Sequence, residues 1–337
     1  MRTAPLFTAL AVCALACSCR SGPDKLERRE VPGAIESARA ALAANRSEQA
    51  LELMRAAANT PGLEPATRDT VQTLLESSAS RRIEELSGPG RDPEDLAELV
   101  ELDLPRQIAV TAGMRAARGY FAAGEAVDAY RLLRRLDTKF PLHHERAAAG
   151  DLLVDIGLWL VVHGTGWFGL GHSTDDAVEV LEYVVLQHPS TVRCDEAYES
   201  LAQIYVDDRE FELAVERLEN LVLFHPHSAR VPRARARIPH LRLAGIRSPE
   251  YDRSQLLAAR TELERWLTDF TGREPELERG VRVDLGDCLR RLCDSDVIVA
   301  DFYARVDKPR GERYHLERAV EEARAAGDEA RLSATSR

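Results

Sequence analysis

The chain has 337 residues, of which 45% are hydrophobic and 30% are charged, and its formal net charge at pH 7 is −11. This excess of carboxylates argues against a protein that neutralises nucleic-acid phosphates along a groove. The 16 prolines and 20 glycines recur along the chain. That spacing fits a stacked array better than one compact globule, because each repeat needs only its neighbours to bury its apolar face.

The amino terminus has the pattern of a secretory signal. Arg2 provides a short positive region, and the apolar run from Leu6 to Ala16 is too short to cross a bilayer as a permanent helix. We therefore predict that 1–16 are a signal peptide. Residues 17–32, which contain Ser21-Gly22-Pro23 and then many charges, are predicted to be an anchor followed by a flexible tether.

The segment Ala14-Leu15-Ala16-Cys17 resembles the lipobox of bacterial lipoproteins, in which the cysteine receives the lipid. The resemblance implies lipidation of Cys17, palmitate included, with Cys19 as the alternative. The competing interpretation is an ordinary signal cut near Ala16, with incidental cysteines. Ser18 stands where an aspartate marks inner-membrane retention in enterobacterial lipoproteins. We therefore expect a chain anchored by lipid at the periplasmic face of the outer membrane.

Residues 33–105 are predicted to form additional N-terminal helical repeats. Apolar residues at helical spacing line one helix from Ala34 to Leu42 and another from Ala50 to Ala57. A longer helix follows at about 66–86. Asp92-Pro93 then begins a short helix that ends near Pro105.

A better-formed helical array is predicted over 106–332, with a disordered tail at 333–337. The step from Pro189 to Pro226 is 37 residues (226 − 189), close to the roughly 34-residue tetratricopeptide period. The expected helices are 107–122 with 125–139, 144–162 with 174–187, 192–207 with 210–224, 230–244 with 252–269, then about 275–293 leading into 297–306, and 311 to about 332.

No segment alternates with the period of a β-strand for long. The predicted fold class is therefore all-α, a tetratricopeptide-type helical-hairpin solenoid. Its concave face, made by the first helix of each pair, is the groove expected to bind an extended segment or a helix.

Two stretches of this array, 113–141 and 198–226, can be laid over one another. In each, small residues let two antiparallel helices approach, large apolar residues fill the gap between pairs, and a proline closes the second helix. These offsets predict the residues of the repeat interiors, which are Ala117, Tyr120, Ala129, Pro141, Ala177, Pro189, Ala202, Tyr205, Ala214, Pro226, Ala259, Trp266, Ala300, Tyr303 and Ala319.

Three features of 106–332 resemble the BamD family, the tetratricopeptide lipoproteins of the bacterial outer-membrane β-barrel assembly machine. Repeats end in an aromatic residue or histidine followed by proline, as in Phe140-Pro141. Tyr251-Asp252 and the segment 257–267 resemble the place where the family inserts a loop before a second helix. Leu289-Arg290-Arg291-Leu292 and Val299-Ala300-Asp301-Phe302-Tyr303 resemble its long connecting helix.

The resemblance implies protein partners: the barrel-forming assembly protein at the carboxy-terminal repeats and barrel precursors at the amino-terminal ones. Two departures change this expectation. Residues 33–105 lengthen the array at its front, and the last repeat, 311–332, lacks the closing aromatic-proline pair.

Two further features are candidates for partner binding. Trp167 and Phe168 lie in a glycine-rich connection, where they either form a docking finger or fold back onto the array. Arg230, Arg233 and Arg237 are spaced three and four apart, so they share one helix face. That face either meets an acidic partner or lipid headgroups, or is paired with neighbouring acids.

No catalytic, metal or cofactor site is predicted. The glycine-rich run from Gly164 to Gly171 has no preceding strand and no lysine for a phosphate. His143-His144-Glu145 is interpreted as a loop that enters a helix, because adjacent side chains do not converge on a metal. Cys194, Cys288 and Cys293 are expected to be unpaired, packed thiols.

The leading hypothesis from the sequence is therefore a non-enzymatic outer-membrane lipoprotein scaffold for β-barrel assembly that binds proteins and not nucleic acid. A second hypothesis is an adaptor lipoprotein of the same fold for peptidoglycan enzymes or envelope export. A third, an envelope-polymer hydrolase with 163–173 at its pocket, lacks a recognisable nucleophile or carboxylate pair.

Overall fold

The computed structural model describes residues 25–88, 90–164, 174–246 and 253–335, and it divides the chain into two compact units, 1–116 and 117–337. All regular structure in the described residues is helical, which confirms the predicted all-α class. The signal and anchor predictions, with Cys17 and Cys19, lie outside the described residues. None of the described helices is long and apolar enough to cross a bilayer.

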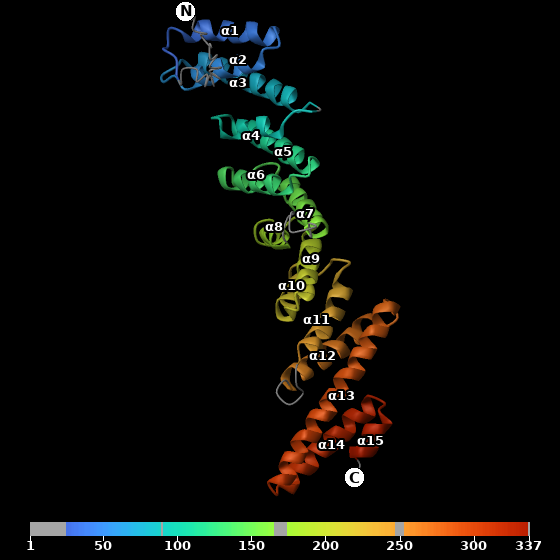
Figure 1. The fold of residues 1–337 in the computed structure, drawn as a ribbon. Coiled ribbons are helices and arrows are strands. Elements are labelled where there is room, and N and C mark those ends of the chain that lie inside the picture. Colours follow the sequence, from blue (N-terminus) through green and yellow to red (C-terminus); the bar gives the residue numbers. More distant parts are fainter. Residues whose placement is uncertain (1–24, 89, 165–173, 247–252, 336–337) are drawn as a thin grey trace, which may run out of the picture. The chain divides into compact units, whose positions relative to one another are not determined.

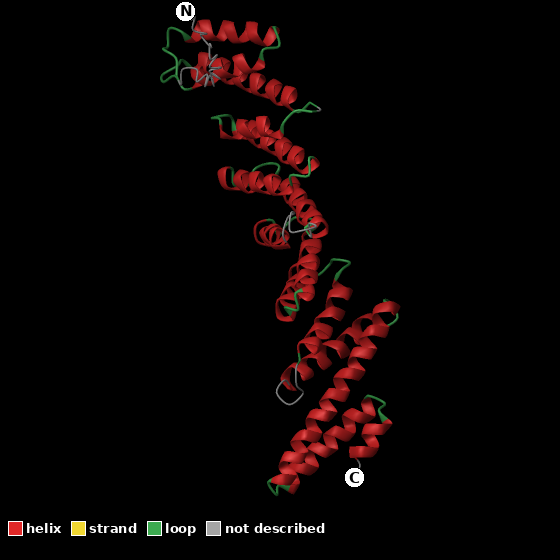
Figure 2. Ribbon diagram, viewed as in Figure 1, coloured by secondary structure: helices red, strands yellow, loops and turns green. Residues whose placement is uncertain are grey.

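Unit 1 (1–116) contains the helices that the sequence predicts as an addition at the front (Figures 1 and 2). Each of these helices buries apolar side chains. Met54 of α2 and Ala79 of α3 are fully buried. Asp92 accepts a hydrogen bond from the Glu94 N–H at 2.9 Å and so caps α4. The unit consists of α1 (Val31–Ala43), α2 (Ser47–Ala58), α3 (Pro65–Leu86), α4 (Pro93–Glu101) and the first part of α5 (Arg106–Ala122).

Unit 2 (117–337) holds the rest of α5 and the longer series of helices. The division between the units falls inside α5, between Ala116 and Ala117. The further helices are α6 (Ala126–Lys139), α7 (Arg146–His163), α8 (Thr174–Gln187), α9 (Cys194–Asp207), α10 (Phe211–Phe224), α11 (Val231–Gly245), α12 (Arg253–Phe270), α13 (Pro275–Arg305), α14 (Pro309–Ala325) and α15 (Glu329–Thr335).

One kind of turn ends the first helix of several hairpins. At Arg209 the backbone φ is +62°, and the next N–H, that of Glu210, donates to the Tyr205 carbonyl five residues back at 2.8 Å. This left-handed ending satisfies the last carbonyls of a helix and reverses the chain. The same φ sign and backbone bond recur at Asn45, Gly124, Asp307 and Gly327. The hairpins α1–α2, α5–α6, α9–α10, α13–α14 and α14–α15 therefore share one design.

The helices at the carboxy terminus differ from the sequence prediction in two places. The segments 275–293 and 297–306 form one continuous helix of 31 residues, α13. The expected helix 311–332 is broken at Gly327, whose φ of +66° ends α14, and α15 continues to Thr335. Residues 333–335 of the predicted tail are thus helical, because the turn at Gly327 lets a further short helix fold back.

The core of unit 2 consists of small and large apolar side chains at helical spacing. Trp266 of α12 is fully buried, and its Nε1 donates to the Pro232 carbonyl at 2.8 Å. Cys194, Cys288 and Cys293 are buried free thiols, and burial raises the pKa of Cys288 to about 12. They pack as small apolar groups.

Candidate functional site

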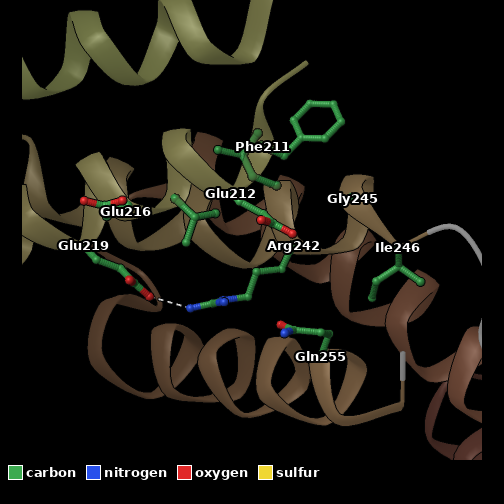
Figure 3. A pocket seen from close by; sticks show the side chains of 10 residues that line it. Phe211, Glu212, Glu216, Glu219, Arg242, Gly245, Ile246 and Gln255 are labelled. Carbon is green, nitrogen blue, oxygen red and sulfur yellow. Dashed lines mark hydrogen bonds and ion pairs between the residues drawn. The ribbon is translucent and has the colours of Figure 1, made fainter. Parts of the chain in front are cut away.

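A hollow opens on unit 2 between α10 and α12, the second helices of two successive pairs, with α11 as its floor (Figure 3). It has a volume of about 310 Å³. Phe211 and Val215 of α10, Leu241 of α11 and Ile246, which follows α11, provide apolar walls, and Gln255 reaches in from α12. Its carboxylates come from one side only, where Glu212, Glu216 and Glu219 are spaced along α10.

A second hollow of about 470 Å³ continues along the same three helices. Glu219 lines both hollows, so they are neighbours, and together we call them the α10–α12 groove. The second hollow is the more apolar. Its lining residues are Glu219, Val222, Leu223, Pro226, Arg235, Ile238, Glu262 and Arg265.

Arg242 stands at the junction of the two hollows and ties the three helices together. Its guanidinium pairs with Glu219 of α10 and, at 3.2 Å, with Glu262 of α12. Burial raises the pKa of Glu262, and the charge of Arg242 only partly opposes that effect. The Arg242 cation is therefore occupied in holding the groove together.

Two charges remain open to a partner at different places in the groove. Among the described residues, exposed Glu212 in the first hollow and exposed Arg265 in the second have no ion pair. By contrast Arg235 is paired with Asp269 at 2.7 Å and lies over the Phe270 ring. The groove thus offers apolar walls with an acid in one half and a base in the other. It suits a segment of polypeptide that carries apolar side chains and charges of both signs.

The predicted repeat-interior residues divide into three classes in the structure. The small side chains Ala117, Ala129, Ala177, Ala202, Ala214, Ala259, Ala300 and Ala319 are buried, as is Trp266. Tyr120, Tyr205 and Tyr303 are half-buried, and each gives its carbonyl to the turn described above. Pro141, Pro189 and Pro226 are exposed and do not lie in the interior. A proline after a helix prevents its continuation without being buried, because it has no backbone N–H and its ring clashes with the preceding turn.

The predicted basic face of α11, which we call the α11 stripe (Arg230, Arg233 and Arg237), is turned toward α9. Arg230 pairs with Glu199 at 2.5 Å, with Glu196 at 3.3 Å and with Asp195 at 3.6 Å. Arg233 approaches Glu199 at 3.5 Å, and Arg237 donates to Gln203 at 2.8 Å. Burial and the charge of Arg233 lower the pKa of Arg237. Of the alternatives that the sequence left open, these contacts correspond to pairing with neighbouring acids. Trp167 and Phe168 lie outside the described residues.

Sequence reasoning missed a buried polar cluster around Asp137 of α6. This carboxylate accepts hydrogen bonds from Tyr183 at 2.9 Å, Arg146 at 2.9 Å and His188 at 2.6 Å, and His143 Nε2 lies 3.3 Å away. Burial alone would raise the pKa of Asp137, but His188, Tyr183 and Arg146 together hold it below its ordinary value. The cluster fixes the ends of α6 and α8 to the start of α7.

A second buried carboxylate, Asp296 of α13, joins three helices. It pairs with Arg253 of α12 at 2.8 Å and with His315 of α14 at 2.7 Å. Neither cluster forms a short sequence motif, because it depends on partners from different helices, such as His188 with Asp137, 51 residues apart, and Arg253 with Asp296, 43 residues apart. No group of three or more His, Cys, Asp or Glu residues in the described parts of the chain is arranged to hold a metal ion.

No protein-family model matches the chain, and no curated protein matches its sequence. Three solved structures are similar over most of its length. Aspartyl phosphate phosphatase F from Bacillus subtilis is 12% identical with a TM-score of 0.30, covering 92% of this chain and 79% of its own. A Rap protein complexed with competence and sporulation factor is 13% identical with a TM-score of 0.25, covering 91% and 80%.

The third structure is a circular tandem repeat protein that is 14% identical, with a TM-score of 0.21, covering 91% of this chain and 74% of that one. TM-scores this low carry no argument about the site. The assignment to helical-hairpin repeats stands on the helices and recurring turns of the chain itself.

Proposed function

We propose that this protein is a binding scaffold for other polypeptides and that the α10–α12 groove is its recognition surface. The observation that carries the proposal is the pair of adjoining hollows between repeated hairpins, with apolar walls and one open charge of each sign. Apolar side chains of a partner enter the hollows. Glu212 and Arg265 set the direction in which the partner segment lies, because each attracts a partner residue of the opposite charge. The groove lies on the side of the second helices, not on the first-helix face that the sequence favoured.

Leu223 allows a sharp test of this surface, because the chain contains its own control. Leu223 is 68% exposed and lines the second hollow, whereas Leu186 is 70% exposed at the corresponding place 37 residues earlier (223 − 186). Leu223→Glu places a charge in the apolar hollow and should weaken partner capture about tenfold or more. Leu186→Glu should leave capture unchanged. Equal effects of the two variants would contradict the assignment of the groove.

The finer proposal is that the scaffold is a lipoprotein at the periplasmic face of the outer membrane and takes part in β-barrel assembly. It is supported by the lipobox-like Ala14-Leu15-Ala16-Cys17 and by the BamD-like segments within 106–332. Fractionation of cells that express Cys17→Ala tests the anchor: the variant should leave the membrane fraction, and the parent should remain in it. Retention of the variant would point to Cys19 or to no lipid anchor.

The barrel-assembly role has its own test. The purified chain, incubated with envelope extract, should retain the barrel-forming assembly protein, and Leu223→Glu should reduce that retention. Depletion of the protein should lower the amounts of outer-membrane β-barrel proteins. Unchanged barrel levels would contradict this role and leave the scaffold proposal intact.

A second candidate is an adaptor for peptidoglycan enzymes or an envelope export complex. The additional hairpin α1–α2 and helices α3 and α4 favour it, because they enlarge the surface beyond the expected BamD-like array. Retention of peptidoglycan enzymes or export components, together with normal barrel levels after depletion, would support this alternative.

A further inference from the structure

The turn between α13 and α14 is the end of a long hairpin in unit 2 (Figure 2). We call residues 302–314 the α13–α14 tip. It carries four cations, Arg305, Lys308, Arg310 and Arg313, against two acids, Asp307 and Glu312. All four cationic side chains are exposed. The tip thus has two more cations than acids on a chain whose net charge is −11, and the exposed acids Asp301 and Glu317 flank it.

The cations of the tip are not used to hold the structure together. In the described residues, none of the four forms an ion pair with a carboxylate, and Arg305 donates only to the Asp301 backbone carbonyl, at 3.2 Å. Further along α14, Arg318 differs from these four cations because it has partners within the hairpin. It lies over the Tyr314 ring and approaches Asp296 at 3.7 Å. The tip therefore presents its positive charge to whatever lies outside it.

Apolar side chains accompany these cations. Phe302 is 53% exposed, Val306 45% and Tyr314 54%. Phe302 and Val306 are four residues apart at the end of α13, so they lie on one side of it. Exposed aromatic and aliphatic groups among unpaired cations mark a surface for a partner that is both apolar and anionic.

The backbone of the tip is held in place by its own contacts. The Lys308 N–H donates to the Tyr303 carbonyl at 3.0 Å, and Asp307 has the left-handed φ of +52°. A Cβ on Gly311 would come within 2.6 Å of the Tyr303 ring, which also stacks on His315 with ring centres 5.6 Å apart. The backbone of the tip is therefore already in place before it meets a partner, and binding costs little backbone entropy.

We propose that the α13–α14 tip docks on a bilayer surface rich in anionic headgroups. The four cations bind lipid phosphates, while Phe302, Val306 and Tyr314 enter the boundary between headgroups and acyl chains. The tip is the end of a hairpin, and its apolar groups and cations are distributed around that end. This arrangement fits a fluid surface that adapts to it. The proposal is independent of the α10–α12 groove and of the lipid anchor.

Hydrogen exchange on the full chain tests the docking at the tip itself, separately from any membrane binding through the amino terminus. The exchange rate of backbone amides in peptides covering 300–316 is measured under three conditions. These are vesicles of phosphatidylcholine alone, vesicles of phosphatidylcholine with an equal part of phosphatidylglycerol, and soluble poly-glutamate. The anionic vesicles should slow exchange in this segment several-fold, and the neutral vesicles should not. Protection by poly-glutamate but not by anionic vesicles would replace the bilayer with an acidic protein, and protection by neither would overturn the proposal.

Two variants and a matched control sharpen the result. Replacing Arg305, Lys308, Arg310 and Arg313 by Gln should weaken binding to anionic vesicles by about tenfold or more, and should abolish the local protection. Replacing Phe302, Val306 and Tyr314 by Gln should weaken binding but keep its salt dependence. The control replaces Arg46, Arg91, Arg209 and Arg273 by Gln, which removes the same charge from exposed positions elsewhere. An equal loss in the control would contradict docking by the tip.

Discussion

The α11 stripe and the α13–α14 tip are both basic surfaces of unit 2, but their cations have different uses. In the stripe, Arg230 alone contacts Asp195, Glu196 and Glu199 of α9. In the tip, Arg310 and Arg313 have no carboxylate partner among the described residues. The stripe therefore joins two repeats, and the tip is available to a partner. A run of arginines helps to hold the structure together where the preceding hairpin supplies acids to it.

The position of each surface in the repeat explains the difference. The stripe lies along α11, whose side faces a neighbouring helix with three carboxylates in its first turns. The tip lies where α13 ends and α14 begins, at the end of a hairpin. Arg230, at the start of α11, reaches the carboxylates in the first turns of α9, whereas in the described residues no carboxylate pairs with the cations of the tip. The comparison yields four stability predictions, from the largest expected effect to the smallest.

The substitution Asp296→Ala is the strongest test of whether buried ion pairs stabilise the fold. This carboxylate is fully buried, and its loss removes the ion-pair partner of Arg253 and the hydrogen-bond partner of His315. We expect a loss of about 3 kcal/mol in the free energy of unfolding, because the partly buried Arg253 guanidinium loses its carboxylate. Urea denaturation followed by circular dichroism measures it. The control Asp301→Ala, at an exposed site on the same helix, should change stability by less than about 0.5 kcal/mol.

The Asp137 cluster predicts a stability that decreases in mild acid. Burial lowers the pKa of His143, with the charges of Arg146 and His144 acting in the same direction and Asp137 against them. The unfolded chain therefore binds a proton at this residue more readily than the folded chain does. As pH falls through about 6.5, the ordinary histidine pKa, stability should be lost, and the depressed pKa of Asp137 extends the loss below about pH 4.

Urea midpoints at pH 7.5, 5.5 and 3.0 measure this dependence. The variant His143→Asn should lose less stability between pH 7.5 and 5.5 than the parent, while keeping the further loss at pH 3.0 that belongs to Asp137. A parent whose midpoint rises on acidification would contradict the assignment of a neutral buried His143.

The stripe itself should show a smaller effect. Arg230→Ala removes three contacts to α9 at a partly exposed site, and we expect a loss of about 1 kcal/mol. Chemical denaturation of Arg230→Ala and of Arg310→Ala compares a paired with an unpaired arginine directly. Equal stabilities of the two variants would break the distinction between the surfaces.

The tip should show the smallest effect on stability. Gln at positions 305, 308, 310 and 313 together should shift the free energy of unfolding by no more than about 0.5 kcal/mol, because these side chains are exposed and unpaired. Thermal unfolding followed by circular dichroism measures the shift. A loss of several kcal/mol would mean that the tip is part of the structure and not a docking surface.

Much of the fold follows from the sequence because helical spacing is local. The predicted pairs 192–207 with 210–224 and 107–122 with 125–139 agree with the structure to within two residues at each end. The break at Gly327 and the continuity of α13 were missed, because a glycine is tolerated within a helix and the polar residues Asp294 to Asp296 suggest a boundary. Pro141, Pro189 and Pro226 follow helices as predicted, but they are exposed and do not lie in the repeat interior.

The site was much harder to predict. Spacing placed Arg230, Arg233 and Arg237 on one face, but their partners, Glu199 and Gln203 among them, come from α9, more than thirty residues earlier. The α10–α12 groove depends on side chains from three helices, and Asp137 meets His188 across 51 positions. Such contacts are set by how hairpins stack, and a single sequence does not encode that in a readable spacing.

Photo-crosslinking in cells tests the central claim most directly. A photoreactive amino acid is placed at Leu223, inside the groove, or at Leu186, its counterpart one repeat earlier. Irradiation should join a partner polypeptide to position 223 and leave position 186 without that adduct. The same adduct in equal yield at both positions, or at 186 alone, would contradict a scaffold that recognises its partners through the α10–α12 groove.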